Sequence, residues 1–283
     1  MLRLVSLLLP CLFFLCSCAQ EADSLQPVVT KRVHRLGDTR ITVSLSRYSG
    51  DGSLVFLCLH DNERTAAEAA KTILQEKGGL LISIDNNEER YIDFRLSGRK
   101  HRFDPNRIFT TPGIRETLRI FNSHSARAER ELRDFASFLL GLLPDSSLLI
   151  AVHNNTDRNY SINDYLPNGR LRNDVLRAHP NYDMDEDDFV FTTDSAVYRM
   201  YADSNINVVL QHNRRATDDG SLSIYYGRRD ISYTNIEAEH GHLEEQVRMI
   251  RALVSRQAAK GAEPHLSRSR RERREEANTS RPE

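Results

Sequence analysis

Hydrophobic and polar positions follow two different periods along the chain, and each change of period marks a predicted element. Leu54–Leu59 is an unbroken hydrophobic run of strand length, as expected for a strand covered on both faces. The next segment, Thr65–Lys77, has apolar residues at helical spacing, and Gly78-Gly79 is a typical helix end. A second hydrophobic run, Leu80–Ile84, follows. The order strand, helix, strand is typical of an α/β protein.

The remaining elements follow from the same two patterns. Further strands are predicted at Arg40–Ser46, Tyr91–Leu96, Ser147–Val152, Phe189–Thr192, Ile206–Gln211, Leu222–Tyr226 and Ser232–Glu237. Further helices are predicted at Ala126–Leu143 and from Leu243 to about Ser255. This order of elements predicts the α/β class, with a mixed central β-sheet flanked by helices.

Three chemically capable side chains stand at the ends of predicted strands. His60 follows the first hydrophobic run, His153 follows Ser147–Val152, and Glu237 is the last residue of its own strand. In open α/β sheets, ligands bind in the crevice beyond the carboxyl ends of the strands. We therefore expect these three side chains to emerge at one edge of the sheet.

The first residues have the pattern of an export signal. The apolar stretch Leu4–Leu15 is too short to span a bilayer but has the length of a signal-peptide core. It ends in Leu15-Cys16-Ser17-Cys18, which resembles a bacterial lipobox. We expect residues 1–17 to be a lipoprotein signal peptide and a lipid on Cys18 to anchor the chain in the bacterial envelope. The residue after Cys18 is Ala19 and not the Asp that resembles an inner-membrane retention signal, so we expect the periplasmic face of the outer membrane. Ordinary secretion is the alternative.

Composition predicts how the rest of the chain is divided. Residues 18–31 are expected to be a tether and residues 32–258 one catalytic domain, whose length suffices for a single large core. Residues 259–283 are rich in Arg, Glu, Ser and Pro and almost lack large apolar side chains. Such a segment cannot bury enough surface to order itself, so a disordered charged tail is predicted.

Charge argues against a nucleic-acid-binding protein, and cysteine content argues against a disulfide-bonded one. The net charge of -1 gives no field that would attract nucleic acid, so no nucleic-acid partner is expected. After removal of the leader and lipidation of Cys18, only Cys58 remains. No intramolecular disulfide is then possible, and Cys58, within a hydrophobic run, is expected to be buried.

The spacing of His60 and Glu63 suits a metal site. An imidazole and a carboxylate three residues apart, where a strand turns into a helix, can both reach one ion. Taken alone, this pair also fits a surface loop with an exposed Glu, but His153 supplies a third ligand. Two histidines and one carboxylate leave the fourth position of zinc open to water, as catalytic sites do. The sequence predicts one Zn²⁺ per chain, although Mn, Co or Fe can use the same ligands.

An ordered set of short motifs resembles a known family. The set resembles the zinc carboxypeptidase superfamily, most closely its succinylglutamate desuccinylase/aspartoacylase branch, and it implies that group's phosphorylase/hydrolase-like fold. Two departures are Asp61, where the branch often has Gly, and His240-Gly241-His242, which matches no motif. The matching segments are His60-Asp61-Asn62-Glu63, Phe103-Asp104-Pro105-Asn106-Arg107-Ile108-Phe109, His153-Asn154-Asn155-Thr156 and Tyr233-Thr234-Asn235-Ile236-Glu237-Ala238.

The resemblance implies a role for each remaining candidate residue. Glu237 is expected to be the catalytic carboxylate, with Glu239 on the same strand face as the alternative. Arg99 corresponds to the family's separate active-site arginine, which would stabilise the developing oxyanion. Asn106 and Arg107 are expected to bind a carboxylate of the substrate, which the planar fork of arginine matches.

Together these features predict a zinc metallohydrolase that cleaves an amide or peptide bond in a carboxylate-bearing substrate. The carboxypeptidase and N-acyl amino acid amidohydrolase types stay equally open, and the location suggests a cell-wall peptide. One alternative is a non-catalytic, metal-containing envelope binding lipoprotein. Another alternative is a structural lipoprotein in which the motifs are coincidental. The metal-free and metal-loaded forms of such a protein would unfold at the same temperature.

Two further groups of residues have weaker patterns. The acidic cluster of Asp183, Asp185, Glu186, Asp187 and Asp188 lacks the Gly and terminal Glu of an EF-hand and is expected to be a solvated loop. Glu239, His240 and His242 could form a second metal site, but their place between a strand and a helix equally suits helix capping. At most a supporting role is expected of them. The possible pocket-lining residues after His153 are Tyr160, Ser161 and Tyr165.

Overall fold

A computed structural model describes residues 26–50, 52–144 and 148–256. Its nine-stranded sheet consists of β1 (Val28–Leu36), β2 (Thr39–Tyr48), β3 (Leu54–Cys58), β4 (Gly79–Asp85), β7 (Leu148–Asn155), β8 (Val175–His179), β9 (Phe189–Thr192), β10 (Val208–Gln211) and β11 (Thr234–Glu239). A separate hairpin contains β5 (Ile92–Leu96) and β6 (Arg99–Phe103).

Helices are found on both sides of the large sheet. They are α1 (Arg64–Lys77), α2 (Thr111–Ile120), α3 (Ala126–Leu140), α4 (Ser195–Asp203), α5 (Leu222–Gly227) and a last helix over residues 243–256, with 3₁₀ turns η1 (Pro105–Arg107) and η2 (Ile162–Tyr165). Among the described residues, no helix combines the length and hydrophobicity needed to cross a membrane.

The large sheet is mixed, in the order β1-β2-β4-β3-β7-β11-β9-β10-β8. Its centre is parallel, because β3 pairs with β4 and β7, and β7 pairs with β11, all in parallel. The outer pairs β1–β2, β2–β4, β9–β11 and β8–β10 are antiparallel. The expected α/β class, with a mixed central sheet flanked by helices, is confirmed.

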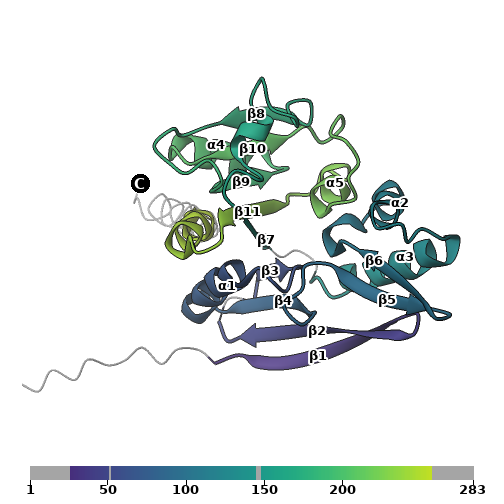
Figure 1. The fold of residues 1–283 in the computed structure, drawn as a ribbon. Helices are drawn as coiled ribbons and strands as arrows, with labels where there is room; N and C mark the ends of the chain where they lie inside the picture. Colours follow the sequence, from purple (N-terminus) through teal and green to yellow (C-terminus); the bar gives the residue numbers. More distant parts are fainter. Residues whose placement is uncertain (1–25, 51, 145–147, 257–283) are drawn as a thin grey trace, which may run out of the picture.

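Two hydrophobic layers cover the two faces of this sheet. On one face, α1, α4 and the last helix pack against Phe56, Ile150, Val152 and Ile236. On the other face, α2, α3 and the β5–β6 hairpin pack against Val55, Leu57 and Ala151. Figure 1 shows this three-layer arrangement, with α1 and α4 on the left and α2, α3 and α5 on the right. The central strands are thus covered on both faces, which explains their continuous hydrophobic runs.

Several elements have other boundaries in the structure than the sequence predicts. The long helix ends at Leu140 and not at Leu143, and β7 continues through His153 to Asn155. His153 therefore lies within its strand. The tether was expected to reach Lys31, but β1 begins at Val28 and pairs along its length with β2. The leader, Cys18 and residues 259–283 lie outside the described residues.

The prediction of a strand at Leu222–Tyr226 is wrong, because this segment lies in helix α5. Leu222 and Ile224 alternate as strand residues do, yet five residues are too few to separate a period of two from a helical one. The short helix buries Leu222, Ile224 and Gly227. Cys58 is buried, as expected.

Candidate metal centre

Adjacent parallel strands bring the three predicted metal ligands together. His60 lies two residues after β3, Glu63 is the residue before α1, and His153 is in the neighbouring strand β7. All three side chains are buried, and their ligand atoms lie within 4.8 Å of one another. The expected grouping of His60, Glu63 and His153 is therefore present in the fold.

Both histidines turn the same ring nitrogen toward the Glu63 carboxylate. His60 Nδ1 lies 2.9 Å from Glu63 Oε1, and His153 Nδ1 lies 2.8 Å from Glu63 Oε2. Glu63 makes no side-chain cap of α1, so its carboxylate faces the histidines and not its own helix. The arrangement offers two imidazole nitrogens and one carboxylate around a common point.

Polar side chains of the motif hold these ligands in place. Asn154 accepts a hydrogen bond from the Ala66 backbone N–H, which fixes the start of α1 against β7. Gln246, fully buried on the last helix, donates to the carbonyls of His153 and Ile236. These bonds fix the relative positions of β7, β11 and the first turn of α1.

The donor set fits a divalent cation. Asp104 lies 2.8 Å from His60 Nε2, so a proton on Nε2 leaves the Nδ1 lone pair free for a metal. His153 Nε2 is buried without a partner among the described residues. Three nitrogen and oxygen donors with no thiolate match a catalytic zinc site and not a closed structural one.

Electrostatics keep Glu63 ionised. Burial alone would raise its pKa, but the adjacent His60 and His153 hold the pKa below its usual range. Burial likewise opposes a charge on His60, while Glu63 and Asp104 raise the pKa of His60 to about 9. A carboxylate that stays deprotonated is the form a metal requires.

Arg90 is a site residue that the sequence patterns did not identify. It comes from the loop between β4 and β5, and its Nη1 donates to Glu63 Oε1 at 2.6 Å. Its side chain is about one-third exposed, at 37%, so it also reaches toward solvent. The surrounding Glu88-Glu89-Arg90 looks like an ordinary charged loop, and no pattern distinguishes it.

Arg99 lies elsewhere. It is exposed at the first position of β6, next to the hairpin turn, where it pairs with Leu96. Five residues of extended chain, roughly 16 Å, separate it from Asp104. Among the described residues, nothing joins Arg99 to the metal ligands, so its position does not support the role expected of it.

Glu237 lies beside His153. Strand β11 pairs with β7 in the register Glu237 to His153, while Glu239 is opposite Asn155. Glu237 is buried, and its Oε1 accepts a hydrogen bond from Asn235 Nδ2 at 2.8 Å. Burial raises the pKa of Glu237, which suits a group that exchanges a proton. Of the two candidate carboxylates, Glu237 is therefore the one next to the ligands.

Asn106 and Arg107 lie in η1, directly after Asp104. The Asn106 backbone N–H donates to Asp104 Oδ1, and Asn106 Oδ1 is buried without a partner in the described part of the chain. Arg107 Nη1 donates to Asp219 Oδ2 at 2.6 Å. The presence of Asp219 was not expected from the sequence.

Tyr165, which is buried, and Tyr160, which is partly buried, form a pair close to this group. Their hydroxyls are hydrogen-bonded to each other, and both rings pack against Phe189, the register partner of Glu237. Burial, reinforced by Glu237, raises the pKa of Tyr160. Both tyrosines therefore remain neutral phenols.

A second group of possible ligands contains Asp185, Glu239 and His242. Asp185 is exposed, and the other two are partly exposed. His242 Nδ1 lies 3.0 Å from the buried Asp188, which also accepts from the Glu239 backbone N–H. These bonds give His242 a partner within the protein and agree with the supporting role expected of it.

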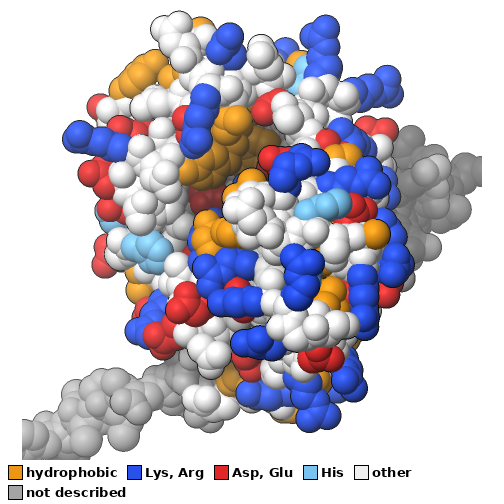
Figure 2. All heavy atoms as spheres, turned by 45° about the vertical axis from the view of Figure 1, so that its right-hand side comes forward, with side chains coloured by type: hydrophobic (Ala, Val, Ile, Leu, Met, Phe, Trp, Pro, Cys, Tyr) orange, Lys and Arg blue, Asp and Glu red, His pale blue; other side chains and the backbone are white. Residues whose placement is uncertain are grey.

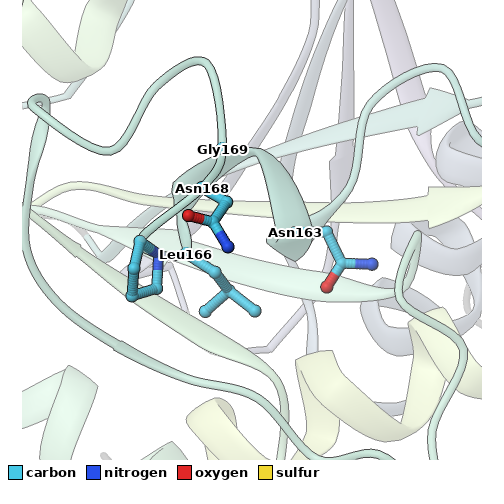
Figure 3. Close-up of a pocket in the computed structure, with 5 residues that line it drawn as sticks. Asn163, Leu166, Asn168 and Gly169 are labelled. Atoms are coloured by element: carbon cyan, nitrogen blue, oxygen red, sulfur yellow. The ribbon is translucent and has the colours of Figure 1, made fainter.

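The molecular surface has a hollow, and a pocket lies beside η2. Figure 2 shows a hollow with hydrophobic side chains along its wall, acidic side chains at depth and several Lys and Arg side chains around it. A hollow of this mixed lining can hold a ligand with apolar and charged parts. The pocket in Figure 3 lies in the loop after η2, is lined by Asn163, Leu166, Pro167, Asn168 and Gly169, and contains no charged group.

No family model matches this chain, and no curated protein matches its sequence. Similar solved structures include an aspartoacylase family protein from Mesorhizobium loti, with 14% identity, a TM-score of 0.40, and coverage of 83% of this chain and 69% of that one. A succinylglutamate desuccinylase/aspartoacylase from Rhodobacter sphaeroides has 12% identity and a TM-score of 0.40, over 85% and 68%.

A provisionally described carboxypeptidase from Burkholderia mallei has 11% identity and a TM-score of 0.40, over 83% of this chain and 64% of that one. The first two of these proteins are described by the names of the branch that the sequence motifs resemble.

Proposed function

We propose that this protein is a zinc-dependent hydrolase that cleaves an amide bond in a carboxylate-bearing substrate. The observation that carries the proposal is the position of Glu237, buried in register beside His153, with His60 and Glu63 within reach of the same point. A metal site used only for stability has no need of an additional buried carboxylate next to its ligands. Carboxypeptidase and N-acyl amino acid amidohydrolase activities both fit this arrangement.

His60, Glu63 and His153 would hold the ion. When bound, zinc would activate a water molecule and polarise the substrate carbonyl. Glu237 would take the proton from that water and pass it to the leaving amine. Its raised pKa, caused by burial, brings it closer to the pH at which such transfers are efficient.

Arg90 is the guanidinium best placed to stabilise negative charge on the carbonyl oxygen. It is the only arginine that, among the described residues, bonds directly to one of the three ligands. The positioned donors would thus be Arg90 at the reacting carbonyl and Asn106 with Arg107 at the substrate carboxylate.

The test has two stages. The mature full-length chain should bind about one zinc per chain by elemental analysis, and His60→Ala/His153→Ala should lose it. The zinc-loaded protein should then hydrolyse members of a panel of N-acyl amino acids and short peptides. Absence of zinc from the wild-type chain, even after zinc is supplied, would overturn the proposal.

Two neighbouring carboxylates provide matched variants. Glu237→Gln should retain zinc and lose about 100- to 10,000-fold in kcat, the usual contribution of a general base. Glu239→Gln, two residues along the same strand, should retain most activity. Zinc binding without hydrolysis of any panel member would favour a non-catalytic binding protein.

We also propose that the chain acts in the bacterial envelope, anchored through lipid on Cys18, with a cell-wall peptide as the substrate. Support comes only from the leader pattern, which lies outside the described residues. Incorporation of labelled palmitate into the wild-type protein, and its loss in Cys18→Ala, would test the anchor. Secretion of unlabelled wild-type protein would contradict it.

A further inference from the structure

The guanidinium expected to bind a substrate carboxylate already has a carboxylate partner. Arg107 Nη1 donates to Asp219 Oδ2 at 2.6 Å. The two residues come from distant parts of the chain, η1 and the loop that precedes α5. Both side chains remain about two-fifths exposed, at 38% and 45%, so a ligand can reach them.

Asp219 is fixed in this position by its own loop. The backbone N–H and the hydroxyl of Ser221 donate to its Oδ1 at 3.0 and 2.6 Å. The other oxygen is thereby directed at Arg107. Asp219 is therefore a built partner of Arg107 and not a freely rotating surface group.

The backbone also holds the two segments together. The Phe109 N–H donates to the Gly220 carbonyl at 2.9 Å. A Cβ on Gly113 would lie 2.1 Å from the Gly220 Cα, so the two segments of the chain are in contact at these glycines. This contact keeps the Asp219 loop beside η1.

The ion pair lies next to the proposed catalytic groups. Arg107 follows Asp104, the partner of His60, by three residues, and its charge helps to lower the pKa of Asp104. Through η1 and Asp104, the ion pair is thus connected to His60 of the metal centre.

A simple carboxylate does not match this pair. Asp219 cancels the charge of Arg107, and an entering carboxylate would meet Asp219 as a like charge. Among the described contacts only Nη1 of Arg107 is used, which leaves Nη2 and Nε for a ligand. A group with one carboxylate and one ammonium would satisfy Arg107 and Asp219 at once.

We propose that Arg107 and Asp219 form a subsite for a zwitterionic amino-acid head, a carboxylate and an ammonium on the same carbon. The proposal rests on the proposed function and narrows its substrate class to amides in which one amino acid keeps a free α-carboxylate and a free α-ammonium. Asp219 is then a specificity-determining residue, and Arg107 supplies the carboxylate contact.

Binding of the expected products tests the proposal without requiring turnover. Calorimetry on the zinc-loaded full chain would compare lysine with 6-aminohexanoate and ornithine with 5-aminopentanoate, pairs that differ only in the α-ammonium. The wild type should bind the amino acid of each pair at least about tenfold more tightly, the effect of one charge-assisted hydrogen bond. Asp219→Asn should reduce this preference to near parity.

The control is Asp230→Asn, an exposed position in the same part of the chain, which should leave the preference unchanged. Equal binding within each pair, no binding of either, or a preference that survives in Asp219→Asn would overturn the proposal. Failure of the hydrolase proposal is distinguishable, because it appears as missing zinc or missing hydrolysis in the experiments above.

Discussion

Asp104 decides which nitrogen His60 can offer to a metal. By accepting a hydrogen bond from the Nε2–H of His60, it leaves Nδ1 directed at the point where Glu63 and His153 meet. Loss of such an outer carboxylate typically weakens metal binding about 10- to 100-fold. We predict this loss for Asp104→Asn, measured by competition with a zinc chelator. Asp93→Asn, which removes charge from the ion pair with Arg102 on the β5–β6 hairpin, should bind zinc normally.

Two arginines offer a direct comparison. Because Arg90 contacts Glu63 and Arg99 is exposed on the hairpin, only Arg90→Ala should reduce kcat/KM, by about 100- to 1000-fold, with zinc retained. Steady-state kinetics and elemental analysis on both variants check this. A larger loss in Arg99→Ala than in Arg90→Ala would restore the role first expected for Arg99.

At this scale, sequence identified residues that stand in a local motif and missed those that depend on loop packing. His60 and Glu63 are three residues apart, and His153 and Glu237 end hydrophobic runs, so pattern alone finds them. Arg90 approaches Glu63 across 27 positions, and Asp219 approaches Arg107 across 112. Nothing in the neighbouring sequence reports such contacts.

At the scale of elements, the contact between the α5 loop and the start of α2 holds the two parts of the proposed pocket together. Gly220 has a φ of +82°, and a Cβ there would lie 2.4 Å from the Arg107 carbonyl oxygen. Gly220→Ala should therefore cost about 2 kcal/mol or more in unfolding free energy. Denaturant titration measures this, with Gly52→Ala, where a Cβ meets nothing, as the neutral control. Equal effects of the two variants would refute the close approach.

Elements were predictable where burial imposes a clear pattern. Strands β3 and β4 are covered on both faces and read as continuous hydrophobic runs, and α1 buries Ala66, Ala70 and Ile73 at helical spacing. Helix α5 was misjudged because it is shorter than two turns. Strand β6, Arg99–Phe103, is basic and half exposed, and its place is set by pairing with β5, which local sequence does not reveal.

For the whole molecule, Asp187 links stability to pH. Burial and the nearby acids Asp185, Glu186 and Glu239 raise its pKa to about 6, against one opposing hydrogen bond from the Arg158 backbone. The folded state then holds a proton that the unfolded state has lost. The stability contributed by that proton is complete below about pH 4 and disappears as pH rises through 6.

Asp187→Asn should remove this pH dependence. The variant should be more stable than the wild type by about 1 kcal/mol or more at pH 7.5 and should differ little at pH 4.5. Chemical denaturation at the two pH values checks this, beside Asp183→Asn on the exposed side of the same loop. A stability difference that is the same at both pH values would show that Asp187 is not responsible.

The three predicted metal ligands all lie between residues 60 and 153, whereas Asp219 and Glu237 come from the later part of the described chain. The proposed base and the proposed specificity-determining residue are therefore encoded apart from the residues that would hold the ion. On the proposed function, a substitution at Glu237 would end turnover and one at Asp219 would change the substrate, while the ion stays bound.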